Sequence, residues 1–559
     1  MITKIEKIRT TPSISRIDIQ KLLFVVVSAL GFIWAWNYLD MSVLSFFDDL
    51  SNVANLFKRM YPPDFSGMQR IINAMLETLW MALLGTALAA VLSYPLALGA
   101  AKNTTPHPYV RYLCRSLITL TRAVPELILA AIFVVAFNPG PFAGVLAIGL
   151  HSIGMIGRLF ADAIELGNES PREAILAVGS TRRQTTRSAI IPQALPSMIA
   201  TVLYRLEINI RGSSVLGLVG AGGIGIIVSE SLESIQYKPA LAAVSVLFVV
   251  IVCVELASTA IRGSLLGDAA NFGRQTRQGF FTRRATMRNQ RLNEKAARTR
   301  AVTPPWTSER LFRVGLGASF GFLVVVAIFS VDINWWQAVL DTPRINIVLK
   351  QLFPPSFGGE RSGIFNGILE SFAMAVVAAV LGISLALPIS VAISRNINKS
   401  AFLAKVYRLL VLALRAVPEL IVAVIFVSAM GLGPVPGTLA LTVTVIFFAA
   451  KLFGDTLEEV DSAPREAVSS VGASRAQEFV STVIPQFIPS FVSNSFYLLD
   501  VYFRSSTILG IVGGGGIGYL LIQSIRVYQF DVTATIVISV FLVVLVIEWV
   551  GNWVRGLYR

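Results

Sequence analysis

Several kinds of residue are scarce in this chain, and each shortage excludes a class of protein. Only 14% of the 559 residues are charged, whereas soluble domains carry roughly 25%, so an ordinary soluble enzyme is not expected. The two cysteines, Cys114 and Cys253, exclude a disulfide framework and a cysteine-rich metal site. The two histidines, His107 and His151, leave little material for a zinc site or a Ser-His-Asp triad. We therefore expect no metal and no cofactor.

A nucleotide-binding P-loop is also missing. The motif GxxxxGK[ST] requires the dipeptide Gly-Lys, which occurs nowhere in the chain. The chain is therefore not predicted to be an enzyme. If ATP drives its activity, hydrolysis must take place in a separate subunit.

Long apolar runs are abundant instead, since 54% of the residues are hydrophobic. A membrane-spanning helix needs about 20 mostly apolar residues, and twelve stretches approach that length in two groups of six. The first group lies near 22–39, 76–101, 113–137, 142–164, 194–218 and 240–261. The second lies near 314–331, 367–394, 406–429, 435–453, 487–512 and 533–550. We expect an all-α integral membrane protein with about twelve transmembrane helices.

The net charge of +14 is concentrated in two segments. Residues 1–21 carry five Lys/Arg against two acidic residues, a net +3, and residues 262–313 carry twelve against three, a net +9. Basic segments favour the cytoplasmic side of a membrane. We therefore predict a cytoplasmic N-terminus, a cytoplasmic linker at 262–313 and, after twelve spans, a cytoplasmic C-terminus. These charges indicate topology and contact with membrane lipid, and no nucleic-acid partner is expected.

The two halves of the chain are parallel repeats. RAVPEL at 122–127 recurs at 415–420, PREA at 171–174 recurs at 464–467, and VGAGGIG at 219–225 matches VGGGGIG at 512–518, each at an offset of 293 residues. The predicted halves are 22–261 and 314–559. An even number of spans in each half gives both repeats the same orientation, with a pathway between them.

A polar segment between the fourth and fifth spans of each half has a fixed pattern. A Glu-Ala pair is followed by a glycine six residues after the glutamate and by a proline nineteen residues after it. The residues are Glu173, Ala174, Gly179 and Pro192 in the first half, and Glu466, Ala467, Gly472 and Pro485 in the second. Ser170-Pro171-Arg172-Glu173 predicts a helix start with Ser170 as N-cap, and the second half has Ala463 at that cap position.

This spacing resembles the EAA loop of ABC-importer permeases. Within that family, PPDFS at 62–66, GPFAGVLAI at 140–148 and RLEINIRGSSVLGLVGAGGIG at 205–225 resemble phosphonate permeases of the PhnE type, two of which would be fused here. The resemblance implies a type I ABC importer permease fold in a bacterial inner membrane. It also implies two ATP-binding ABC subunits docked at 170–192 and 463–485, and a periplasmic or lipid-anchored phosphonate-type solute-binding protein.

The expected function is therefore ATP-driven import of a phosphonate or a related small phosphorus oxyanion. Phosphite, phosphate or another small anion is an alternative within the same architecture. A proton-coupled carrier with six plus six spans is an alternative of another class, although it would not need two EAA loops. A membrane enzyme is a third option, and it lacks a nucleophile–base set or a cofactor motif.

Glycine-rich segments follow the fifth span of each half. The glycines are Gly220, Gly222, Gly223, Gly225, Gly513, Gly515, Gly516 and Gly518. The spacing GxGxxG is satisfied twice, but a dinucleotide site needs a preceding strand and a βαβ unit. Because glycine permits a positive φ and a close backbone approach, we expect a sharp turn. It is either part of an outer gate or of a docking face for a binding protein, or a plain tight turn.

Charged residues within the spans occur at repeat-related positions. The pairs are Arg122/Arg415, Glu126/Glu419, Glu207/Asp500 and Arg211/Arg504. Residues four apart can pair on one helix face, as in Arg122 with Glu126 and Glu207 with Arg211, and Pro125 and Pro418 permit a kink. One interpretation makes these structural ion pairs. The other places Arg211 and Arg504 near the pseudo-axis, where guanidinium groups would attract a passing oxyanion.

A few other polar and aromatic residues are expected to be structural. His151 lies in an apolar span, and a packed, hydrogen-bonded role is favoured over a proton relay. The aromatic residues near span ends are expected to anchor the chain at the membrane interface. They are Tyr204, Tyr497, and the pairs Trp34–Trp36 and Trp335–Trp336.

Overall fold

The computed structural model describes residues 16–270, 306, 308–331, 333, 342–398 and 400–557. Three predicted features fall wholly or partly outside these residues. They are the start of the N-terminal segment 1–21, most of the basic linker 262–313, and the pair Trp335–Trp336.

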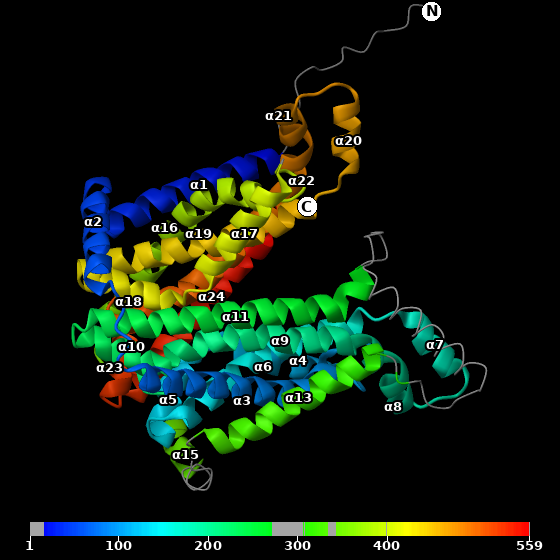
Figure 1. Cartoon of the computed structure of the whole chain (residues 1–559), viewed down its shortest axis with the longest axis horizontal. Helices are drawn as coiled ribbons and strands as arrows, with labels where there is room; N and C mark the ends of the chain where they lie inside the picture. Colours follow the sequence, from blue (N-terminus) through cyan, green and yellow to red (C-terminus); the bar gives the residue numbers. More distant parts are fainter. Residues whose placement is uncertain are drawn as a thin grey trace, which may run out of the picture. The chain divides into compact units, whose positions relative to one another are not determined.

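All regular structure within the described residues is helical (Figure 1). The first half contains α3 (Met68–Ala100), α4 (Pro108–Ala123), α5 (Glu126–Phe137), α6 (Pro141–Glu165), α7 (Glu169–Ala177), α8 (Arg182–Thr185), α9 (Ile191–Leu216), α10 (Ile224–Glu233) and α11 (Tyr237–Ala270). The second half contains α16 (Arg361–Ile393), α17 (Ala401–Arg415), α18 (Glu419–Met430), α19 (Pro434–Glu458), α20 (Ala463–Ser470), α21 (Arg475–Glu478), α22 (Ile484–Leu509), α23 (Gly518–Arg526) and α24 (Phe530–Leu557). The remaining helices are α1 (Arg16–Tyr38), α2 (Val43–Met60), α13 (Ser308–Ser330) and α15 (Thr342–Gln351).

The helices form two compact units that do not coincide with the predicted halves 22–261 and 314–559. The N-unit is Pro62–Val348, and the C-unit combines Met1–Tyr61 with Leu349–Arg559. Within the C-unit α1 packs against α16, and within the N-unit α13 packs against α3 (Figure 1). The first helix of each repeat thus joins the other repeat's unit. The repeat offset identifies equivalent helices but says nothing about which copy the first helix contacts.

Nine described helices are long and apolar enough to cross a membrane, and two bent helix pairs raise the number to 11. The bent pairs lie at the predicted spans 113–137 and 406–429, in which Pro125 and Pro418 were expected to permit a kink. α4 and α5 meet at 84°, and α17 and α18 at 72°. Pro125 and Pro418 break the helices because proline lacks an N–H and disfavours helical conformation in the preceding residue. The remaining predicted span, 487–512, lies on α22, the repeat counterpart of α9.

Small residues allow α3 and α6 to pack closely in the core of the N-unit. A Cβ atom placed on Gly85 would lie 2.7 Å from a methyl of Ile148, and one on Gly149 would lie 2.7 Å from a methyl of Leu88. Without a hydrophobic driving force between helices in lipid, such close backbone approach supplies the packing energy. The packing of α3 against α6 holds the helices that carry the polar sites described below.

Candidate coupling and translocation sites

The segment between α6 and α9 carries the first copy of the predicted coupling motif. α7 ends at Ala177, and Gly179 follows with φ +82° while its N–H donates to the carbonyl of Leu176 at 2.9 Å. This left-handed glycine closes the helix C-terminus as glycine commonly does. Gly472 repeats the arrangement after α20, with φ +85° and a 3.0 Å bond to the carbonyl of Ser469. The glycine of the motif is therefore a helix terminator in both halves.

A short capped helix follows each glycine. Thr181 and Gln184 form a capping box at the start of α8, and Ser474 and Gln477 do so at α21. Five residues of π-helix, Thr186–Ile190 in one half and Phe479–Val483 in the other, then lead into α9 and α22. Pro192 and Pro485 lie in the first turns of those helices, directly after the π turns. The coupling segment thus continues into a membrane-spanning helix without a break.

The predicted N-cap of α7 is wrong. The helix begins at Glu169 with Asn168 as N-cap, and the Asn168 side chain accepts the N–H of Ser170 at 3.0 Å. Asp461, the repeat counterpart of Asn168, accepts the N–H of Ala463 at 3.0 Å, but α20 begins at Ala463 with Ser462 as N-cap, so the predicted cap position Ala463 is also wrong. Asparagine and aspartate commonly bond the backbone two residues ahead. This bond begins the turn two residues earlier than the serine-proline pattern suggested.

All eight coupling-motif residues are exposed in the structure. Two apolar residues beside them are exposed as well: Val178 with 83% of its surface accessible and Val471 with 82%, at positions related by the repeat. Neither α7 nor α20 has a buried residue. A small, partly apolar helix at matched positions is a surface suited to docking against another protein.

The two coupling segments differ in how they are held. Arg465 of α20 bonds to Glu478 of α21 at 2.7 Å and to the carbonyl of Asn396 at 3.0 Å, and the Glu478 side chain is 15% exposed. The repeat counterpart Arg172 instead pairs with Glu169 within α7. The second segment is therefore tied to the loop between α16 and α17, whereas the first has a local pair.

The broken helix separates Arg122 from Glu126. Arg122 lies in the last turn of α4 and Glu126 begins α5, so the expected pairing on one continuous helix face is wrong. Glu126 lies 3.8 Å from Arg205 of α9, which also donates to Ser152 at 2.9 Å. In the C-unit, Glu419 accepts a 2.9 Å bond from Ser505. The carboxylate at the helix break is thus held by the fifth span in each half.

His151 bonds to the carbonyl of Val124 at 3.0 Å. That carbonyl precedes Pro125, where the helix break leaves it without a helical donor. The expectation of a packed, hydrogen-bonded His151 is confirmed.

Arg211 belongs to a buried ion cluster in the N-unit. It lies 4.0 Å from Glu207 and 3.6 Å from Glu255 of α11, and Arg262 of α11 lies 3.1 Å from Glu207. Glu207 and Glu255 are only 2% and 3% exposed. The cluster joins α9 to α11, as the structural interpretation requires. In the C-unit, Arg504 pairs with Asp500 one helical turn away.

Glu255 and Arg262 were missed at the sequence level, although a signal was present. Glu548 and Arg555 occupy the same positions in the second half at the offset of 293 residues. The repeat therefore marks these residues as it marks Arg211, and a systematic comparison of the sixth spans would have found them.

The glycine segments are tight turns between helices. In the C-unit the turn follows α22 and precedes α23, with Gly513, Gly515 and Gly516 at φ between +80° and +83°. Glu370 of α16 accepts the N–H of Gly516 at 3.0 Å, and Ser371 accepts the N–H of the next residue at 3.0 Å. Helices rather than a strand flank the turn, so the dinucleotide interpretation does not hold.

The N-unit repeats this turn between α9 and α10. Gly220, Gly222 and Gly223 have φ between +82° and +91°, and Thr78 of α3 accepts the N–H of Ile224 at 2.8 Å. Gly225 and Gly518 lie at the helix starts, where a Cβ would collide with the carbonyls of Ser214 and Thr507, respectively. Within the N-unit, α10 and α7 lie at opposite ends (Figure 1). The coupling segment and the glycine turn therefore occupy the two ends of α9.

Comparison with known proteins agrees with this geometry. The sequence matches the family described as "Binding-protein-dependent transport system inner membrane component" over residues 93–266 and again over 378–558. The chain belongs to this family. As a permease with two family domains in one chain, it is 40% identical over 523 residues to the phosphate-import permease protein PhnE of Mycolicibacterium smegmatis. That alignment covers 94% of this permease and 92% of the relative.

Other relatives correspond to one half of the permease. The phosphite transport system permease protein PtxC of Stutzerimonas stutzeri is 42% identical over 229 residues, which is 41% of this chain and 82% of the relative. A permease chain in a structure titled as inward-facing conformations of the MetNI methionine ABC transporter is 22% identical, with a TM-score of 0.33, over 35% of this chain and 96% of its own. The expectation of two permease halves fused in one multi-span chain is confirmed.

Proposed function

We propose that this permease forms the membrane pathway of an ATP-driven importer for phosphorus oxyanions. The observation that carries the proposal is the 40% identity with a phosphate-import permease over 94% of the chain. A phosphite-transport permease is similarly related to one half. Phosphonate, phosphate and phosphite share a tetrahedral phosphorus with anionic oxygens, and we assign that chemical class to the pathway. Phosphite or phosphate as the main cargo is the alternative within the class.

Two ATP-binding ABC subunits dock at the coupling segments 170–192 and 463–485 in this proposal. The exposed Val178 and Val471 support it because each places an apolar side chain beside the motif residues. This chain contributes no P-loop, so the docked subunits hydrolyse the ATP. A periplasmic or lipid-anchored solute-binding protein delivers the anion from outside. The permease lies in a bacterial inner membrane with both termini in the cytoplasm.

The coupling works through helix continuity. From Arg182 to Val219 the chain is a single helical run of 38 residues that includes the π turn and α9. Movement of α7 and α8 by the ATPase is therefore carried along α9 toward the glycine turn at its far end. The contacts of Glu126 and Arg211 with neighbouring helices hold α9 against α5 and α11. We assign Arg211 to this structural role and Arg504 to a local pair with Asp500 on its own helix. Arg122 and Arg415 are assigned to the pathway beside the helix breaks. Movement of the glycine turns opens the outer end.

Uptake into proteoliposomes tests the proposal. The permease is reconstituted with a P-loop ATPase and a solute-binding protein encoded beside it, and uptake of phosphate, phosphite and methylphosphonate is measured. We expect uptake that requires ATP, is blocked by vanadate and is insensitive to a proton ionophore. Uptake that the ionophore abolishes and that vanadate does not inhibit would instead establish the proton-coupled alternative.

A further inference from the structure

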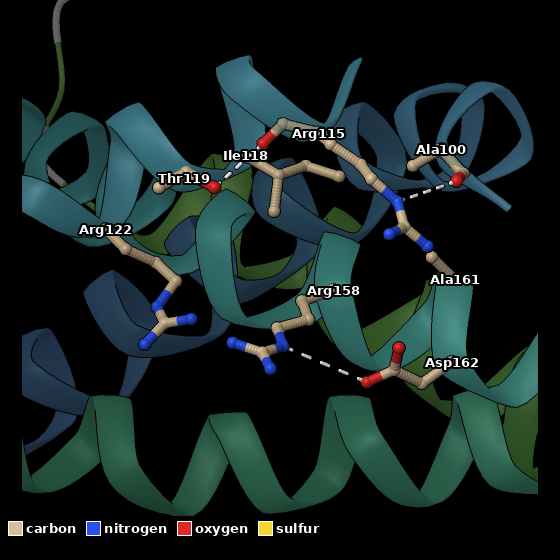
Figure 2. A pocket seen from close by; sticks show the side chains of 8 residues that line it. All are labelled: Ala100, Arg115, Ile118, Thr119, Arg122, Arg158, Ala161 and Asp162. Carbon is tan, nitrogen blue, oxygen red and sulfur yellow. Dashed lines mark hydrogen bonds and ion pairs between the residues drawn. The ribbon is translucent and has the colours of Figure 1, made fainter. Parts of the chain in front are cut away.

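A cavity of about 210 Å³ with a mixed polar and apolar lining lies in the N-unit (Figure 2), and it shares no lining residue with the ion cluster of Arg211. It is lined by Ala100, Arg115, Ile118, Thr119, Arg122, Arg158, Ala161 and Asp162. Ala100 ends α3, and Asp162 lies in the last turn of α6, just before the coupling segment. The cavity is therefore at the coupling end of the unit. It is smaller than the roughly 300–1,000 Å³ of pockets for drug-sized ligands, so its size suits a small ion.

The lining carries three guanidinium groups and one carboxylate. Arg115 is engaged with Glu165 at 3.0 Å and with the carbonyl of Ala100 at 3.1 Å. Arg158 lies 4.0 Å from Asp162, at the outer limit of an ion pair, and their side chains are 61% and 50% exposed. Figure 2 shows the guanidinium groups of Arg122 and Arg158 extending toward the same side of the cavity. Guanidinium forks are suited to the oxygens of a tetrahedral oxyanion.

A glycine on α6 makes room for Arg122. A Cβ atom on Gly154 would lie 2.8 Å from the carbonyl oxygen of Ile118 and 2.9 Å from the backbone nitrogen of Arg122. The repeat counterpart of Gly154 is Phe447, and Arg415 stacks on the next residue, Phe448, at 5.1 Å from the ring centroid. The second half therefore has an aromatic residue at the position where Gly154 lets α6 approach Arg122 closely.

The charges of the second half are also neutralised more closely. Arg408, the counterpart of Arg115, bonds to Asp455 at 2.7 Å and to Glu458 at 3.3 Å. Lys451, the counterpart of Arg158, bonds to the same Asp455 at 2.8 Å. Leu412 replaces Thr119. The second half thus supplies a comparison in which the cations at the matched positions of Arg115 and Arg158 are more closely paired with carboxylates.

We propose that the cavity lined by Arg115, Thr119, Arg122 and Arg158 is an anion site for a phosphoryl or phosphonyl group, present in the first half only. The proposal rests on the function proposed above, and it places a stopping point for the anion at the coupling end of the pathway. Two sources share this chemistry, the soluble oxyanion and the head group of an anionic phospholipid. Tyr112 and Leu120 are exposed apolar side chains on α4, the helix that also carries Arg115, Thr119 and Arg122. Lipid chains would contact such side chains, so the test includes the lipid source.

Binding of radiolabelled inorganic phosphate to the purified full chain tests the site without ATPase or binding protein. We expect saturable binding that methylphosphonate displaces and chloride does not. Arg158→Gln is expected to weaken binding about tenfold or more, as for loss of a charged hydrogen-bond donor. Lys451→Gln, which removes the cation at the matched position of the second half, is expected to leave binding unchanged. Matching thermal unfolding of both variants and the native chain shows that the fold is retained.

Repeating the phosphate titration in nanodiscs with and without phosphatidylglycerol distinguishes the soluble oxyanion from the lipid head group. Competition by that lipid assigns the site to a lipid head group, and unchanged phosphate binding assigns it to the soluble anion; either result supports a phosphoryl site. Absence of saturable phosphate binding in detergent, or equal weakening by both variants, overturns the proposal. ATP-driven uptake by the complete transporter in that case would leave the proposed function standing while the site fails.

Discussion

Replacement of Arg211 by methionine separates the structural and the pathway interpretations of the buried charges. The change keeps the length of the side chain and removes the guanidinium that lies 3.6 Å from Glu255 and 4.0 Å from Glu207. Glu207 retains Arg262 at 3.1 Å, so the main loss falls on Glu255, which is 3% exposed. Removing one partner of a buried pair costs about 3–5 kcal/mol, whereas polar contacts between membrane helices average about 0.6 kcal/mol with a maximum near 1.7.

The Arg211 contacts are long and Arg262 remains beside Glu207, so we expect Arg211→Met to lower the free energy of unfolding by an amount between these limits, about 2 kcal/mol. For a unit of this size that corresponds to a fall of roughly 4–8 °C in the unfolding midpoint. Arg70→Met is the matched control in the same unit. Arg70 pairs with Glu230 at the shorter distance of 2.7 Å, but the side chains are 70% and 54% exposed, and such pairs contribute about 0–1 kcal/mol. The control is therefore expected to unfold within about 2–4 °C of the native chain.

The assay is thermal unfolding of the purified chain in detergent, together with uptake per folded molecule in proteoliposomes. Arg211→Met should unfold earlier yet transport at the native rate below its midpoint. Adding Glu255→Gln to Arg211→Met should recover most of the lost stability, because the carboxylate is then no longer charged. Native stability of Arg211→Met combined with lost uptake would refute the structural role and move Arg211 into the pathway.

Three further outcomes follow from the coupling segments and the glycine turns. Val178→Asp and Val471→Asp should each reduce ATPase attachment in a pull-down and lower uptake by about tenfold, since each puts a charge into an apolar contact; native attachment in both would exclude these positions from the docking surface. Gly515→Val should lower yield and unfolding temperature, because its φ is +80° and a Cβ would lie 2.6 Å from a backbone carbon of Pro434; native uptake and stability would contradict that constraint. Glu478→Gln should increase proteolysis within 463–478 because it weakens the 2.7 Å contact with Arg465, and an unchanged cleavage rate would show that α20 is held by other contacts.

Most of the architecture was predictable from patterns that repeat at 293 residues. The apolar runs predicted the membrane helices because burial in lipid requires about 20 apolar residues per span whatever their neighbours are. The Glu-Ala, glycine and proline spacing predicted a coupling segment, and the structure shows why that glycine is needed, with φ +82° at Gly179. The cap of α7 was mispredicted because Asn168 and Ser170 are both good capping residues, and the bond that forms depends on local backbone geometry.

Sequence by itself determined the class of this protein, the duplication, the approximate spans and the positions of the polar residues, since these follow from composition and spacing along one chain. Tertiary structure alone decided which charges meet. The break at Pro125 directs Glu126 toward Arg205 rather than along its own helix, and α11 brings Glu255 to Arg211. It also decided that α1 and α13 pack on the units of the opposite repeats. The repeats share the same order of helices, so which unit each first helix packs on depends on contacts in space and not on local pattern.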